Sequence, residues 1–215
     1  MIHRLKKPGQ FRARKSAVLD TFNANILTIS VAATTMTLEE RNLCRDLIVT
    51  PPHGVSQISK EEFVRRFPLA VAGGKLAPSW LEEAYKAQNA EELQCALAVG
   101  FTFGFAPEHK EIFRRLIGED WHYSHEDVVS ALETWPVPDT VEALFRATQW
   151  IPKSLEYDDS RALAVKAIWA LGKIPGTEAD ASLKALARSD DIVLRKTAVE
   201  QLERRTKRPE PLGMQ

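Results

Sequence analysis

Apolar residues recur at intervals of three and four along most of the chain after Thr37, with polar residues between them. Within residues 125–135, positions i, i+3, i+4 and i+7 are filled by Val128, Ala131, Leu132 and Trp135. This spacing places the apolar side chains on one face of an α-helix, and the strict alternation of a half-buried strand does not compete with it. The pattern predicts helices over 38–49, 59–67, 79–88, 91–100, 108–117, 125–135, 139–150, 161–172, 178–188 and 192–205.

Local signals mark where these helices begin and end. Thr37 with Glu40 three residues later predicts a capping box, and Ser59 with Glu62 repeats the spacing. Two prolines at 51 and 52 stop the first helix, because proline cannot continue one. The segment AVAGGKLAP, residues 70–78, is expected to be a loop.

The helical pattern repeats at intervals typical of two-helix units. A shift of 39 residues carries Leu132 to Leu171 and Leu144 to Leu183, whereas a shift of 31 carries Leu171 to Leu202. A shift of 35 carries Leu97 to Leu132. Because one helix pair cannot bury its apolar face alone, such repeats stack on one another. We therefore predict an all-α fold, a short right-handed α-solenoid of about four to five helix pairs.

The repeats suggest a division of the chain into four parts. We expect an irregular basic arm over residues 1–36 and degenerate repeats over 37–118. Clear repeats cover 119–205, and a basic, flexible tail covers 206–215.

The repeated segment resembles a known class of helical repeat. The residues that carry the likeness are Ala170-Leu171-Gly172, Gly176, Leu183, Leu186, Asp190, Asp191 and Arg195. They are similar to the short bacterial HEAT repeats of the phycobilin-lyase-like type, in which an alanine-rich helix ends in Ala-Leu-Gly before a glycine-containing turn. The region from Glu119 also resembles small bacterial HEAT proteins encoded beside polymorphic toxins. Both resemblances imply a scaffold whose second helices line a concave face.

The net charge of zero hides an uneven distribution. Residues 1–15 hold six Lys/Arg and no acid, whereas residues 16–203 hold 19 Lys/Arg and 28 Asp/Glu, a net charge of −9. An acidic body disfavours nucleic acid as the ligand, because binding phosphates requires a basic face. It favours a basic protein partner, although solubility alone also explains acidic surface.

The two cysteines and the hydropathy pattern bear on the cellular location. Cys44 and Cys95 lie in apolar helical stretches without metal-binding or CxxC spacing. We predict two reduced, buried thiols in a cytoplasmic protein, with a disulfide between them as the alternative. No stretch reaches the roughly 20 apolar residues of a membrane span. The basic start and the apolar run 25–33 faintly resemble a signal sequence, so secretion is the alternative location.

Pairs of acids recur at equivalent positions, each just before the first helix of a repeat. They are Glu119-Asp120, Asp158-Asp159 and Asp190-Asp191. In a stack these loops share one edge, so the pairs are expected to form an acidic ridge for a basic partner. An aspartate at a helix start also caps free backbone N–H groups, which explains one carboxylate of each pair without a partner.

The segment DWHYSHED places two histidines among carboxylates. His122 and His125, with Asp120, Glu126 and Asp127, could contribute metal ligands. HEAT enzymes that hydroxylate a modified lysine hold iron with a His-Glu pair in several repeats. Here the repeat shifts align His125 with Ala164 and Arg195, so the pair is not repeated. We predict capping and packing roles and no metal, cofactor or catalytic residue, because nucleotide-binding and nucleophile motifs are missing from the sequence.

The second helices of the repeats carry the predicted binding surface. Its residues are Glu142, Arg146, Gln149, Trp150, Lys184 and Arg188, with the aromatic Tyr157 and the acidic pairs beside it. The predicted function is a non-enzymatic protein-binding scaffold, most sharply an immunity or antitoxin-like protein that binds a basic toxin domain. Two alternatives are a lyase-like or chaperone-like HEAT protein acting on a protein or tetrapyrrole, and a metal-dependent HEAT hydroxylase.

Overall fold

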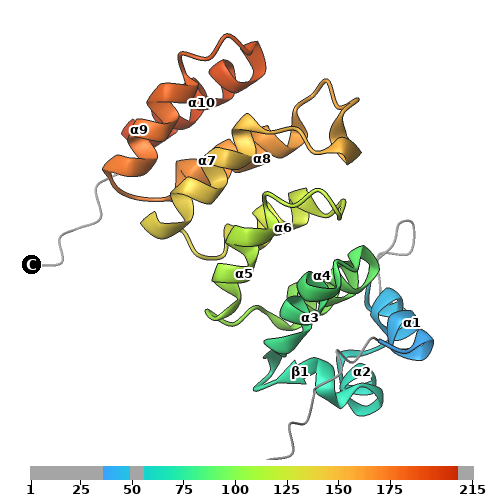
Figure 1. Ribbon diagram of the computed structural model, residues 1–215. Helices are drawn as coiled ribbons and strands as arrows, with labels where there is room; N and C mark the ends of the chain where they lie inside the picture. The colour runs from blue at the N-terminus through green and yellow to red at the C-terminus, as the bar shows by residue number, and fades with distance from the viewer. Residues whose placement is uncertain (1–35, 49–55, 208–215) are drawn as a thin grey trace, which may run out of the picture. The chain divides into compact units, whose positions relative to one another are not determined.

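A computed structural model describes residues 36–48 and 56–207, and the all-α prediction is confirmed for them (Figure 1). The α-helices are α1 (Leu38–Leu47), α2 (Lys60–Arg66), α3 (Ser79–Ala87), α4 (Ala90–Phe103), α5 (His109–Leu116), α6 (His125–Leu132), α7 (Val141–Gln149), α8 (Ala162–Lys173), α9 (Thr177–Leu186) and α10 (Ile192–Thr206). Short 3-10 helices are η1 (Pro68–Ala70), η2 (Pro138–Thr140) and η3 (Lys153–Leu155), and the strands are β1 (Val71–Ala72) and β2 (Lys75–Leu76).

The helices from α3 onward form two alternating sets. Helices α4, α6, α8 and α10 contact one another in succession, and α3 contacts α5 as α7 contacts α9. The two sets are joined by the pairs α3–α4, α5–α6, α7–α8 and α9–α10, which follow one another in Figure 1. Contact between alternate helices is compatible with the predicted solenoid, in which equivalent helices of successive repeats stack.

The inward faces of the helices are those that the periodicity indicated. In α6, Val128, Ala131 and Leu132 are fully buried, and in α8 the same holds for Ala167, Ile168 and Leu171. Trp135 lies just beyond α6 and is half-buried against Phe113, with ring centroids 6.1 Å apart. Burial of these faces between neighbouring helices forms one continuous core.

The predicted caps are present. The Thr37 hydroxyl accepts from the Glu40 amide at 3.2 Å while the Glu40 carboxylate accepts from the Thr37 amide at 2.7 Å, which completes the capping box of α1. Ser59 accepts from the Glu62 amide at 3.2 Å at the start of α2. These contacts are local in sequence, so they can be predicted without knowledge of the packing.

The segment 70–78 is not a plain loop. Strands β1 and β2 pair antiparallel, with Val71 opposite Leu76, around Gly73 and Gly74 at φ +57° and +78°. Two consecutive positive φ values are what the tightest hairpin turn requires, and glycine adopts them without strain. Strands of two residues are too short to show an alternating pattern, so the sequence could not reveal them.

Helix α4 extends three residues beyond its predicted end at Gly100. It ends at Gly104, whose φ of +100° reverses the chain so that Phe105 folds back over Gly100. The helix predicted over 139–150 begins with η2, and α7 itself covers Val141–Gln149. The apolar periodicity therefore placed the C-terminal end of α4 too early, because that end depends on how Phe105 packs.

The predicted arm over residues 1–36 lies outside the described residues except for Met36, as does most of the predicted tail, residues 208–215. Across 36–48 and 56–207, none of the helices combines the length and the apolar character that crossing a membrane requires.

The Asp190-Asp191 pair allows a matched test of the capping explanation. Asp191 accepts from the amides of Val193 and Leu194 at 2.8 and 3.3 Å and pairs with Arg161 at 3.3 Å, whereas the Asp190 side chain is exposed. We expect Asp191→Ala to lower the free energy of unfolding by about 1–2 kcal/mol. Asp190→Ala is expected to change it by less than about 0.5 kcal/mol. Urea denaturation of both variants measures the difference, and equal effects would contradict the capping role.

Candidate functional site

Two adjoining hollows lie between α5 and α7, and Gly118 and Arg146 line both. The apolar hollow, of about 360 Å³, is completed by Ile117, Phe145, Gln149 and Trp150. The polar hollow, of about 300 Å³, is completed by Tyr85, Glu111, Arg114, Arg115, Glu119 and Glu142. We refer to them together as the paired hollows.

The pattern of α7 explains how it presents this surface. Its buried side packs with Ala143, Leu144 and Ala147, which leaves Arg146 exposed and Phe145 half-buried at the edge of the core. Phe145 and Gln149 are one turn apart, so both face the apolar hollow. Trp150 follows the helix in an extended conformation and packs edge-on against His125, with ring centroids 5.0 Å apart.

Tyr85 and Arg115 fix the wall of the polar hollow on the α3 side. The Arg115 guanidinium lies 4.1 Å from the centre of the Tyr85 ring and pairs with Glu82 at 3.2 Å. The Tyr85 hydroxyl donates to Glu119 at 2.7 Å. Both polar ends of this wall are therefore already engaged within the protein, which leaves it rigid.

Arg146, by contrast, has no carboxylate partner among the described residues. Its guanidinium donates to the backbone carbonyl of Arg114 at 3.1 Å, while the Arg114 side chain pairs with Glu111 at 2.9 Å. The Arg146 side chain is exposed and stands where the two hollows meet. It can therefore form an additional charge-assisted hydrogen bond with a bound molecule.

The structure brings five of the predicted binding residues together at the paired hollows. They are Glu119, Glu142, Arg146, Gln149 and Trp150. Lys184 and Arg188 lie on and just beyond α9 but line neither hollow. With three arginines and three glutamates, the lining of the polar hollow is balanced in formal charge rather than acidic.

The three acidic pairs lie on loops that ion pairs join to one another. Asp120 lies 4.0 Å from Lys153 in the loop before α8, and Arg161 in that loop pairs with Asp191 before α10. These contacts place the loops before α6, α8 and α10 side by side, as stacking of the repeats predicted. They also neutralise part of the predicted ridge.

Capping, the alternative explanation, holds fully for one pair: Asp191 is the N-cap of α10, whereas Asp158 lies three residues before Arg161, the N-cap of α8, and still binds the first amide of that helix. In the third pair neither carboxylate caps α6, whose N-cap is Ser124. Asp158 accepts from the Ala162 amide at 2.6 Å and from Ser160, and the bond from the Ser160 hydroxyl is the main cause that holds the pKa of Asp158 below its ordinary value. The Asp159 and Asp190 carboxylates are exposed and make no hydrogen bond or ion pair within 36–48 and 56–207. Tyr157 stands beside them with 93% of its surface exposed.

His122 and His125 are packed inside the protein. Their rings stack at 4.2 Å and are 3% and 0% exposed. The Nε2 of His122 donates to the Leu116 carbonyl at 3.0 Å and the Nε2 of His125 donates to the Glu119 carbonyl at 2.7 Å. Burial lowers the pKa of both, that of His122 to about 4 with repulsion from His125 as a further cause. The pair therefore packs as two neutral imidazoles, and the described residues contain no group of three metal-ligand side chains.

The residues of the paired hollows that the sequence analysis missed lie on α3, on α5 and just after it, and on α7. They are Tyr85, Glu111, Arg114, Arg115, Ile117, Gly118 and Phe145. The sequence held one signal that could have identified Phe145 as a site residue: it is next to Arg146 and one helical turn before Gln149. The remaining residues join the site only because α3, α5 and α7 meet in the folded chain.

A scan against protein-family models and searches of curated proteins and of solved structures found no match to this chain.

Proposed function

We propose that this chain is a non-enzymatic protein-binding module and that the paired hollows hold its partner. The proposal is based mainly on one observation: the half-buried Phe145 and Trp150 line the same hollow as Arg146. Arg146 has no carboxylate partner among the described residues. Aromatic residues and arginine dominate the energetic centres of protein interfaces, because they combine a large apolar area with directed hydrogen bonds. The apolar hollow offers a place for one side chain of the partner.

In its sharpest form, the proposal is an immunity or antitoxin-like protein that masks a basic toxin domain. Its support is the net charge of −9 over residues 16–203 and the resemblance of the repeats to toxin-associated HEAT proteins. Because the polar hollow is balanced in charge, the exposed carboxylates of Asp159 and Asp190 would supply the attraction and the hollows the anchoring contacts.

Reversing the charge at the hollows should weaken binding. We expect Arg146→Glu to raise the Kd for a toxin domain encoded beside this gene by about 10–100-fold, because the arginine stands at the centre of the site. Lys196→Glu on α10 makes the same charge change at an exposed residue remote in sequence from the hollows and should alter the Kd less than about threefold. Isothermal titration calorimetry measures both. Equal changes in Kd for the two variants would show that the hollows are not part of the interface.

A second measurement distinguishes a protein-binding module in general from an immunity-like protein that binds a basic toxin domain. If the partner is basic, changing Asp159 and Asp190 together to lysine should slow association and weaken its salt dependence. A partner that responds to Arg146→Glu but not to this change would leave the binding module standing and contradict the basic toxin domain.

A further inference from the structure

Two free thiols meet where the first described helix packs on α4. Cys44 on α1 is 0% exposed and Cys95 on α4 is 5% exposed, and neither forms a disulfide. They lie far apart in the sequence and come together only because α1 contacts α4. The arrangement is independent of the paired hollows and of the proposed function.

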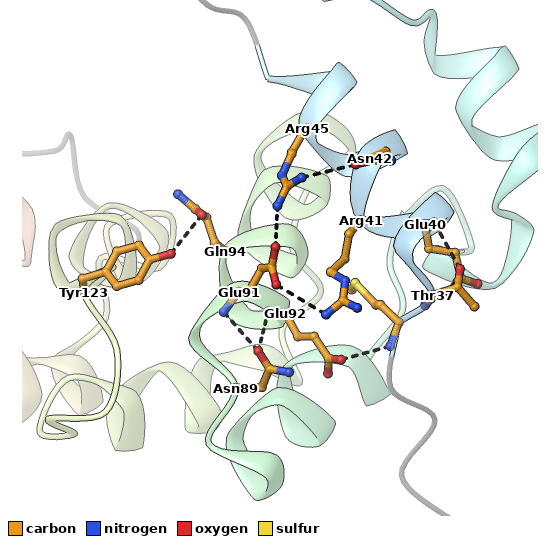
Figure 2. A network of polar contacts seen from close by, with 11 residues as sticks. Thr37, Glu40, Arg41, Asn42, Arg45, Asn89, Glu91, Glu92, Gln94 and Tyr123 are labelled. Carbon is orange, nitrogen blue, oxygen red and sulfur yellow. Dashed lines mark hydrogen bonds and ion pairs between the residues drawn. The ribbon is translucent and has the colours of Figure 1, made fainter.

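A charged clamp fixes the register of α1 against α4. The Glu91 carboxylate accepts from Arg45 and from Arg41, the latter at 3.4 Å, as Figure 2 shows. Arg41 and Arg45 flank Cys44 on one side of α1, and Glu91 precedes Cys95 by one turn on α4. The clamp therefore holds the stretch of α1 that carries Cys44 against the stretch of α4 that carries Cys95.

Further contacts hold the same junction. The Met36 amide donates to the Glu92 carboxylate at 3.0 Å. Leu43 and Leu47 are buried with Cys44 along the inner face of α1. Polar and apolar contacts thus hold α1 and α4 together around the two cysteines.

The two thiols differ in their readiness to ionise. The pKa of the Cys95 thiol is lowered, with the neighbouring Cys44 thiol as the main cause and Arg45 and Arg41 acting in the same direction, while burial and the Glu91 carboxylate oppose them. The neighbouring Cys95 thiol, together with burial, raises the pKa of Cys44. Since the thiolate is the nucleophile and Cys95 is also the more exposed of the two thiols, Cys95 reacts first and Cys44 resolves the product.

We propose that Cys44 and Cys95 form an oxidisable dithiol site, which a peroxide converts into a disulfide joining α1 to α4. The Cys95 thiolate attacks one oxygen of hydrogen peroxide, the O–O bond breaks, and with one proton the products are a sulfenic acid and water. The Cys44 sulfur then attacks the sulfenic sulfur, and the departing hydroxide takes the Cys44 proton as a second water. The two thiols lose two electrons in total, which the peroxide receives.

The disulfide would fix α1, a helix that packs against few other elements of the described structure. Helix α1 contacts α4 and, less extensively, α2. A cross-link between Cys44 and Cys95 closes a loop of about 50 residues, which restricts the unfolded chain strongly. Oxidation should therefore raise the Tm by about 5–10 °C, and a reducing agent should restore the original value.

The test treats the folded full chain with equimolar hydrogen peroxide. We expect intact mass spectrometry to show the loss of two hydrogens and non-reducing peptide mapping to show a Cys44–Cys95 linkage within one chain. Cys44→Ser should instead accumulate a sulfenic acid on Cys95 that dimedone traps, and Cys95→Ser should show neither product. Circular dichroism of both variants checks that they fold.

Two results would overturn the proposal. The first is that both thiols of the folded wild-type chain stay free at a peroxide dose that oxidises the same chain in urea. The second is a linkage found only between chains. Because both results are read from the wild-type protein, the proposal can be contradicted even if a variant fails to fold.

Discussion

Replacing Gly100 by alanine is expected to lower the free energy of unfolding by about 2–4 kcal/mol, although alanine is the better helix former. A Cβ atom at Gly100 would lie 1.8 Å from Cε1 and 2.4 Å from Cζ of the Phe105 ring. That ring is held edge-on by Phe101 and Phe113, with centroids 5.2 and 5.1 Å away. Because a ring inside an aromatic cluster cannot move aside cheaply, the clash outweighs the gain in helix propensity of about 1 kcal/mol.

Gly118→Ala provides the matched control. A Cβ atom there meets nothing within 4 Å and the backbone does not adopt a positive φ, so we expect a change of less than about 0.5 kcal/mol. A double-mutant cycle tests the cause: with Phe105→Ala in place, Gly100→Ala should lose most of its cost. Urea denaturation of the four chains measures the coupling, and additive effects would show that Phe105 is not the obstacle.

Mild acid is expected to destabilise the protein through the buried histidines. The unfolded chain protonates histidine near pH 6.5, whereas burial and repulsion from His125 lower the pKa of His122 to about 4 in the folded protein. Between these values the unfolded state binds more protons, so this stability is fully present above about pH 6.5 and is lost as the pH falls toward 4. We expect the free energy of unfolding to fall by about 2 kcal/mol across this range.

The slope of stability against pH distinguishes this effect from other titrations. The pKa of Asp158 is lowered, so its contribution to stability is constant above about pH 4 and is lost only below it. The pKa of Asp127 is raised by burial, so its titration stabilises the folded protein as the pH falls, opposite to His122. Urea midpoints between pH 7 and 4.5 can be followed by the fluorescence of Trp121 and Trp150, which contact the pair. His122→Asn should reduce the dependence of the free energy of unfolding on pH, whatever its effect on stability at pH 7. An unchanged pH dependence would show that His122 is not its cause.

The site combines residues that the sequence predicted with residues that it could not. Arg146 and Gln149 were expected on the exposed side of a repeat helix, and both are exposed on α7. Trp150 was expected beside them, but it follows the helix and is half-buried. Tyr85 and Arg115 join them from two other helices. Their role depends on the cation–π contact and ion pair that hold α3 against α5, which no spacing along the chain encodes.

By itself, the sequence determined the helices, their buried faces and caps such as Thr37, because these follow from contacts within about four residues. It also predicted that the loops before α6, α8 and α10 lie along one edge, and ion pairs of Asp120 with Lys153 and of Arg161 with Asp191 join those loops. Only the tertiary structure decided that Phe105 closes over Gly100 and that the part of α1 with Cys44 packs on the part of α4 with Cys95. The hollows beside Arg146 were decided in the same way, because packing between segments far apart in the chain is set by the shape and charge of both surfaces together.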